Sequence, residues 1–185
     1  MGYIINVKNC KRAVISANSD SAYTLGTITS MPDLRQIDLT FKTASGDLYG
    51  DGKLVSSLAR LTGATLKIDI DKLTTADKAF FGGHTLSQKG VLQVQADDTP
   101  PQCAIYVEAE HDDGGYEATW FLVCRAQPVG MTAQQQETNI NFSTSSITFD
   151  CIPRKKDSAV VHQADTDDAN FTTANQTAFL AGPDI

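Results

Sequence analysis

Hydrophobic and polar residues alternate with a period of two along several segments of the chain. In residues 36–42, for example, Ile37, Leu39 and Phe41 alternate with polar side chains. This period is typical of β-strands that bury one face, because successive side chains of a strand point to opposite faces of the sheet. The pattern predicts strands at residues 36–42, 65–70, 103–110, 117–126, 138–142 and 145–151, with weaker signals at 3–7, 12–16 and 91–95.

Residues 106–123 are predicted to form a β-hairpin around the turn His111–Gly115. The turn contains Asp and Gly, which adopt positive φ angles readily. The second strand of this hairpin, residues 117–126, is apolar on both faces at its centre. It is therefore expected to be a central strand that is covered on both sides.

One segment departs from the strand pattern and predicts a short α-helix near residues 74–81. Thr74 with Asp77 three residues later resembles a capping box, in which the first side chain satisfies a backbone N–H of the first turn. Gly82 and Gly83 then end the helix. The apolar residues available to pack this helix on a sheet are Ala76, Ala79, Phe80 and Phe81.

Together these segments predict a mainly β fold with two packed antiparallel sheets, a β-sandwich or barrel, and one short flanking helix. The 185 residues favour one domain, which we assign to residues 1–157. Residues 158–185 are polar and acidic before they reach Phe179 and Leu180. We interpret them as a C-terminal extension that docks on the domain or on a neighbouring subunit.

The chain is acidic, with 15 basic and 22 acidic residues and a net charge of −7. This balance lacks the basic surface with which proteins grip a nucleic acid backbone. No apolar run approaches the roughly 20 residues of a membrane helix, and the N-terminus does not read as a signal peptide. We expect a cytoplasmic protein without a membrane partner.

The chain has four cysteines, and none belongs to a C-x-x-C pair. Cys103, Cys124 and Cys151 fall in register with the apolar residues of predicted strands. A free buried cysteine behaves as a small hydrophobic residue. We therefore expect core thiols, with a disulfide or a metal ligand as the alternative.

Candidate catalytic residues are dispersed. His84, His111 and His162 lie in predicted turns or loops, and there is no G-x-S-x-G nucleophile motif. Acidic residues flank the predicted hairpin and two of them on one face resemble a glycosidase pair, although polar residues on an outer strand face need no function. These are Glu108, Glu110 and Glu117. We expect no enzymatic activity and no cofactor.

Two acidic turns contain potential metal ligands. His111, Asp112 and Asp113 combine imidazole and carboxylates, both of which bind metals. The run DTDDAN at residues 165–170 resembles the start of a calcium loop, but Asn170 and Gln176 replace the Gly and Glu that an EF-hand needs. Solvated turns explain both segments, so we expect no bound metal.

The stretch SGDLYGDGKL, residues 45–54, lies between two predicted strands. A Walker phosphate loop does not fit, because the spacing from Gly46 to Gly52 is one residue too long and Leu54 replaces Ser or Thr. The glycines and aspartates favour a turn. Its apolar pair, Leu48 and Tyr49, indicates a partner surface; the alternative is a plain hairpin turn with Tyr49 folded onto its own core.

Four stretches, considered together, resemble the major tail protein (tail tube protein) of long-tailed bacteriophages, in the phi13-like family. They are VKNCKRAVIS leading to YTLGTITSMPDLRQIDL, then DLYGDGKLV, GATLKIDIDKLTTADKAFFGG, and the segment from RAQPVGM to IPRKKD. Their order and spacing span nearly the whole chain. The ending differs, because Phe179-Leu180 stands where the family tends to have Trp-Phe.

The resemblance implies a virion structural protein that self-assembles into hexameric rings. The rings stack into a tail tube, the conduit for DNA ejection, and the implied partners are further copies of the chain, the tape measure protein, and the tail terminator and distal tail proteins. Phage DNA would pass without specific binding, and assembly would occur in the bacterial cytoplasm. Alternatives are another virion β-protein, such as a head–tail completion or baseplate component, and a carbohydrate-binding β-sandwich.

With this resemblance, residues 45–54 are expected to form a subunit-contact loop. Leu48 and Tyr49 are the expected anchors in the neighbouring subunit. Gly50, Asp51 and Gly52 are expected to set the turn.

Overall fold

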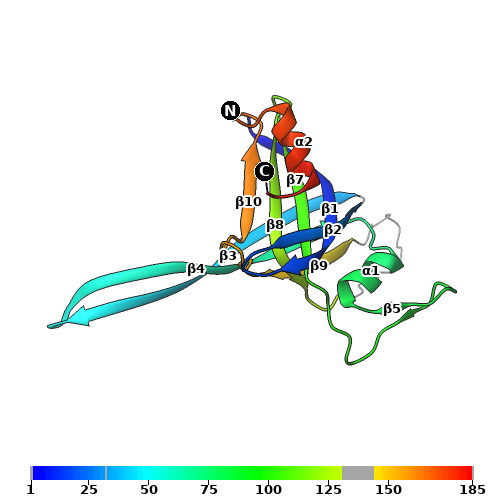
Figure 1. Cartoon of the computed structure of the whole chain (residues 1–185), viewed down its shortest axis with the longest axis horizontal. Coiled ribbons are helices and arrows are strands. Elements are labelled where there is room, and N and C mark those ends of the chain that lie inside the picture. The colour runs from blue at the N-terminus through cyan, green and yellow to red at the C-terminus, as the bar shows by residue number, and fades with distance from the viewer. Residues whose placement is uncertain (1, 32, 131–143, 185) are drawn as a thin grey trace, which may run out of the picture.

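The structure is a computed structural model that describes residues 2–31, 33–130 and 144–184. Within these residues the chain forms ten strands and two α-helices (Figure 1). The predicted strand at 138–142 lies outside the described residues. The elements are β1 (Ile4–Asn18), β2 (Tyr23–Ser30), β3 (Leu34–Gly50), β4 (Lys53–Ile70), α1 (Thr75–Gly82), β5 (Thr85–Leu86), β6 (Leu92–Gln93), β7 (Cys103–His111), β8 (Tyr116–Ala126), β9 (Ser145–Cys151), β10 (Val161–Asp165) and α2 (Thr173–Ala181).

The strands belong to one large antiparallel sheet and one small one. The large sheet has the order β2-β1-β7-β8-β9-β4-β3, and β10 pairs with β8 beside this path. Strands β5 and β6 form the small sheet. The predicted mainly β fold, consistent with a β-sandwich, is therefore confirmed, as is the β7–β8 hairpin. Neither described helix is long and apolar enough to cross a membrane.

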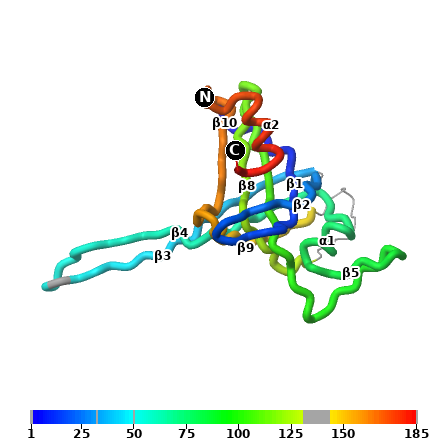
Figure 2. The backbone as a smooth tube through the Cα atoms, viewed as in Figure 1, coloured from blue at the N-terminus to red at the C-terminus, as the bar shows by residue number. Residues whose placement is uncertain are grey.

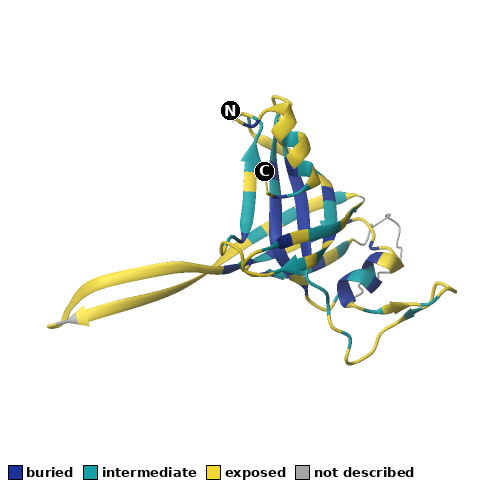
Figure 3. Ribbon diagram, viewed as in Figure 1, coloured by how far each residue is buried: buried dark blue, intermediate teal, exposed yellow. Residues whose placement is uncertain are grey.

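Strand β8 lies at the centre of the core and is covered on both faces, as its sequence predicted. Trp120 and Leu122 belong to the apolar cluster on one face of the sheet. Phe121 and Cys124 belong to the cluster on the other face. Figure 3 shows buried residues concentrated in this part of the sheet. Each large apolar side chain buried in this way contributes about 1.5–3 kcal/mol to folding.

Helix α1 forms where the sequence predicted it, and its ends are capped as expected. The Thr74 hydroxyl oxygen accepts a hydrogen bond from the Asp77 backbone N–H (3.1 Å) and donates one to the Asp77 carboxylate (2.6 Å). Gly83 ends the helix in the left-handed region at φ 69°. Phe81, which is 1% exposed, packs into the core, while Phe80 is only partly buried.

The C-terminal segment contains a strand and a helix that the sequence analysis did not predict. Strand β10 pairs with β8, and the side chain of Thr172 caps the N-terminus of α2. Phe171 and Phe179 are buried in the cluster around Trp120. The indole N–H of Trp120 donates a hydrogen bond to the Phe179 carbonyl oxygen (2.6 Å). Residues 159–184 therefore pack on the sheet of their own chain.

All four cysteines are buried free thiols, and for Cys103, Cys124 and Cys151 this was expected from their strand register. The Sγ atoms of Cys124 and Cys151 lie 2.9 Å apart across neighbouring strands. Burial raises the pKa of Cys10 and of Cys103 to about 12. These thiols are therefore protonated near neutral pH.

Candidate functional site

Strands β3 and β4 continue far beyond the body of the protein. They pair along their whole length, from Leu34 opposite Ile70 to Gly50 opposite Lys53. Near the body β4 also pairs with β9, but that pairing ends at Ala64. Residues 43–62 consequently form a two-stranded hairpin that projects from the sheet (Figures 1 and 2). We call it the arm; eight residues of extended strand give it a length of about 25 Å.

A β-bulge marks the point where the arm leaves the body. The pairing register shifts between Lys42 and Thr43, which leaves Thr62 as the extra residue. The Thr62 hydroxyl donates a hydrogen bond to the Lys42 carbonyl oxygen (3.0 Å). The Lys42 ammonium lies 2.6 Å from the Asp150 carboxylate on β9. The hydrogen bond from Lys42, and to a smaller extent the one from Gln127, lowers the pKa of Asp150. This exposed ion pair links β3 to β9 at the base of the arm.

The distal end of the arm is a two-residue turn. Asp51 and Gly52 both have positive φ angles, 50° and 73°. This is the signature of the type I′ turn that matches the twist of paired strands, and Asp-Gly suits it. Lys53 then begins β4 rather than a helix. The segment is therefore a hairpin turn and does not have the form of a phosphate loop.

The side chains of the arm do not pack on a core of their own chain. All the described residues of the arm are exposed (Figure 3). Leu48 is 63% exposed and Tyr49 is 65% exposed, so the alternative in which Tyr49 folds onto its own core is wrong. The large exposed apolar residues of the arm and its base are Phe41, Leu48, Tyr49, Leu54, Val55, Leu58 and Leu61.

The arm combines this apolar surface with no net charge. Asp47 and Asp51 carry two negative charges, and Lys53 and Arg60 carry two positive charges, in a chain whose net charge is −7. Isolated two-stranded hairpins are marginally stable in water. Large exposed apolar surfaces mark interaction sites. The arm is therefore suited to a partner that offers apolar contact rather than opposite charge.

A second group of exposed apolar side chains lies around the small sheet. Leu86, Val91 and Val94, which we call the β5–β6 surface, are 40%, 56% and 66% exposed. Val94 also lines a pocket of about 320 Å³ together with Leu92 and Pro128. In Figure 1 the arm and the small sheet project from opposite sides of the body. Exposed apolar side chains therefore occur on two elements that lie on opposite sides of the body, in addition to those of Tyr3, Ile4 and Ile5 near the N-terminus.

The three histidines are separated in the fold. The imidazole Nδ1 of His84 lies 2.6 Å from the Asp98 carboxylate beside the pocket. Two hydrogen bonds lower the pKa of Asp98: the larger effect comes from the Gln95 backbone N–H and the smaller one from His84. His162 lies on β10, with its Nδ1 2.9 Å from the Pro183 carbonyl oxygen. His111 is buried at the end of β7, so the structure does not bring these residues together.

The acidic residues of the β7–β8 hairpin have partners within the chain. The Glu108 carboxylate accepts hydrogen bonds from the Tyr106 hydroxyl (2.7 Å) and the Asn9 amide (2.6 Å). Glu110 pairs with a lysine ammonium at 2.7 Å. Glu117 lies opposite Ala109, which places it on the other face of the sheet from Glu108 and Glu110. The three carboxylates do not face one another across a cleft.

Comparison with known protein families and with curated proteins finds no match to this chain. The structure defines a β protein with a projecting apolar arm.

The sequence predicted strands on either side of the arm, at residues 36–42 and 65–70. It did not predict that these strands continue through residues 43–62. The signal for this continuation is the Asp51-Gly52 pair, which lies midway between the strands predicted at 36–42 and 65–70.

Proposed function

We propose that this chain is a structural protein that associates with further copies of itself through the arm, as a tail tube protein of a long-tailed bacteriophage does. The observation that carries the proposal is the exposed apolar surface of the arm. A neighbouring copy that covers Leu48 and Tyr49 would remove this surface from water. About 25 cal/mol is gained for each Å² of apolar surface that is buried.

The two apolar surfaces support a head-to-tail contact between copies. Such a contact joins two different surfaces, and it produces a closed ring or an open filament according to the rotation between copies. In this proposal the arm of one copy lies on the β5–β6 surface of the next. Because these surfaces lie on opposite sides of the body (Figure 1), one chain can hold two neighbours at once.

The charge of the chain supports a tube through which DNA passes. With a net charge of −7, the subunit repels the phosphate backbone more than it attracts it. A conduit of this composition would let phage DNA pass without binding it. The virion is therefore the proposed location, and the tape measure, tail terminator and distal tail proteins are the proposed partners.

The alternative of a carbohydrate-binding module receives less support. Sugar-binding surfaces require exposed aromatic rings, and the single tryptophan, Trp120, is 0% exposed. The exposed aromatic residues are dispersed, because Phe41 and Tyr49 lie at the base and near the tip of the arm and Tyr3 precedes β1. In a self-associating protein, by contrast, the exposed arm would form the contact between copies.

The proposal is tested by assembly of the purified chain. We expect light scattering to rise steeply with protein concentration and electron microscopy to show rings or tubes with a central hole. The double substitution Leu48→Ser with Tyr49→Ala should abolish assembly and leave the fold intact by circular dichroism. Ser45→Ala with Ser57→Ala, two exposed arm residues, is the matched control and should assemble normally. Assembly of the first variant at the wild-type concentration would refute the role of the arm.

Mixing experiments test the head-to-tail contact. Val94→Asp should block the acceptor surface, whereas Gln93→Asp, an exposed neighbour on the same hairpin, adds the same charge and should not. The arm variant and the Val94 variant are each expected to remain monomeric when alone. When mixed, they retain one intact arm and one intact acceptor, so they should form dimers that cannot grow. Absence of these dimers in the mixture would rule out the β5–β6 surface as the acceptor.

A further inference from the structure

The structure brings together two acidic turns that are more than fifty residues apart in the sequence. Strand β10 pairs antiparallel with β8, with Asp165 opposite Glu117. The turn that follows β10 therefore lies beside the turn that precedes β8. Thr166 fixes this position: its backbone N–H donates to the Tyr116 carbonyl oxygen (3.1 Å), and its hydroxyl oxygen accepts from the Tyr116 N–H (2.7 Å).

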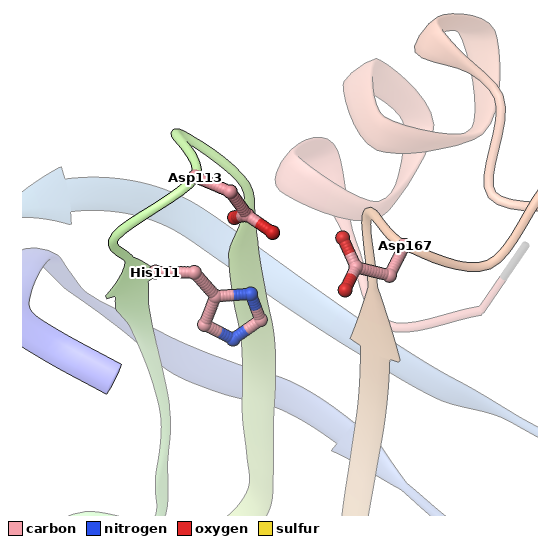
Figure 4. Close-up of side chains that lie close together, drawn as sticks. All are labelled: His111, Asp113 and Asp167. Atoms are coloured by element: carbon pink, nitrogen blue, oxygen red, sulfur yellow. The ribbon is translucent and has the colours of Figure 1, made fainter. Parts of the chain in front are cut away.

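Three side chains from these turns converge at one point. His111, Asp113 and Asp167 each place one potential ligand atom within 4.8 Å of the other two. Figure 4 shows the imidazole ring with one nitrogen turned toward the two carboxylates. The two aspartates are exposed, whereas His111 is only 6% exposed. The cluster therefore joins a buried imidazole to two carboxylates at the surface, and the backbone of Gly2 lies beside it: a Cβ atom there would be 2.7 Å from Asp113 Oδ1.

The buried imidazole is an independent indication of a ligand. Its Nδ1 atom is buried and has no hydrogen-bond partner within the described residues. A buried polar atom without a partner loses its interaction with water and gains nothing in return. A cation held between this nitrogen and the carboxylates would supply the missing interaction.

The backbone of Gly115 lies against both carboxylates of the cluster. The Gly115 N–H donates a hydrogen bond to Asp113 Oδ1 (3.2 Å). A Cβ atom at Gly115 would lie 3.3 Å from both Asp113 Oδ1 and Asp167 Oδ1, and 2.8 Å from the Thr166 hydroxyl oxygen. A side chain at this position would crowd the cluster, and glycine avoids that.

We propose that His111, Asp113 and Asp167 form a binding site for a divalent transition-metal cation such as Zn²⁺. Imidazole nitrogen and carboxylate oxygen are ligands that Zn²⁺ takes in proteins, and a fourth position would be filled by water. Ca²⁺ instead prefers six to eight oxygen ligands. The site differs from the sequence expectation of no bound metal, which treated the two acidic turns separately.

Such an ion would connect the β7–β8 hairpin to the segment that carries helix α2. An ion that binds only the folded protein raises its stability by mass action. The bound cation would therefore hold the C-terminal segment on the sheet. This role does not depend on the proposed self-association, since no residue of the arm takes part.

Isothermal titration of tag-free, EDTA-treated protein with ZnCl₂ tests the site, with CaCl₂ as the comparison ion. We expect saturable binding of one Zn²⁺ per chain and weaker binding of Ca²⁺. Asp167→Asn should reduce Zn²⁺ affinity by about tenfold or more, because even the outer partners of metal ligands have effects of this size. Asp168→Asn lies in the same exposed turn and removes the same charge, so it is the matched control and should bind as the wild type does.

Three outcomes would overturn the proposal. They are the absence of saturable Zn²⁺ binding, tighter binding of Ca²⁺, and equal loss of affinity in the Asp167 and Asp168 variants. Anomalous diffraction from Zn²⁺-soaked crystals should place the ion within bonding distance of all three side chains. His111→Gln, checked for folding by circular dichroism, should lose the same binding.

Discussion

The backbone of Gly63 lies against Cys151 so closely that a Cβ atom at Gly63 would be 2.5 Å from the Cys151 carbonyl oxygen. This contact occurs where the arm joins the body, between β4 and β9. Gly63→Ala must therefore push the two strands apart. We expect a loss of about 1–3 kcal/mol in the free energy of unfolding, the usual cost of overpacking, measured by urea denaturation.

Gly46 provides the control for that substitution. It lies on the arm, and a Cβ atom there would meet no other atom within 4 Å. Gly46→Ala should therefore leave the unfolding free energy unchanged or raise it slightly. If the two variants are equally stable, the close approach of Gly63 to Cys151 does not limit the packing of the arm base.

Phe179 should be the main apolar anchor of helix α2. Its side chain is 4% exposed and packs edge-on against Phe171, with ring centroids 5.8 Å apart. Phe179→Ala should cost about 3–5 kcal/mol and detach the helix from the sheet. Because Trp120 donates a hydrogen bond to the Phe179 carbonyl oxygen, the fluorescence of this single tryptophan should shift to the red. Thr173→Ala, on the exposed side of the same helix, should leave the spectrum unchanged.

The buried thiols should be unreactive in the folded protein. Burial raises the pKa of Cys10 and Cys103 to about 12, and only the thiolate reacts readily with disulfide reagents. We expect no measurable reaction with Ellman's reagent at about pH 8, followed by reaction of all four thiols in guanidinium chloride. Rapid labelling of the native protein would show that the strands open around the cysteines.

Acid should lower the stability of the folded protein through the ion pairs of Arg154. Arg154 is 2% exposed and donates hydrogen bonds to Asp157 and to Asp184. Hydrogen bonds from Arg154 lower the pKa of Asp157 below its usual 3.8. Because the folded state holds this proton less tightly than the unfolded state, the stabilisation is present above about pH 4 and is lost as the pH falls below that value.

Urea midpoints measured between about pH 6 and pH 3 test this dependence. Asp157→Asn should lower the midpoint at pH 6 and make the decline in acid smaller. The same substitution at Asp20, an exposed residue, controls for the change in net charge. A decline in acid that is identical in the wild type and in the Asp157 variant would show that other groups cause it.

Local signals in the sequence predicted most of the sheet. Alternation over residues 65–70 and 145–151 identifies β4 and β9, because each strand buries one face. Thr74 and Gly83 define the ends of α1 through backbone chemistry that depends only on near neighbours. These features were visible without knowledge of the tertiary structure.

Strand β2 was missed although it pairs with its sequence neighbour β1, whereas β10 and α2 were missed because they depend on partners far away in the sequence. Strand β10 has only five residues and a polar sequence, and its pairing with β8 supplies the hydrogen bonds that make it a strand. Helix α2 contains Thr and Asn, which are weak helix formers, and it is held by the burial of Phe179. The cluster of His111 with Asp167 arises from the same pairing. No periodic pattern records such contacts.

The placement of the arm and the β5–β6 surface on opposite sides of the body has a consequence for any assembly built from both. A chain of copies joined in this way would have a direction. An unoccupied arm would remain at one end, and an unoccupied β5–β6 surface would remain at the other. Factors that start and stop growth would therefore need different surfaces, one shaped to receive an arm and the other shaped to supply one.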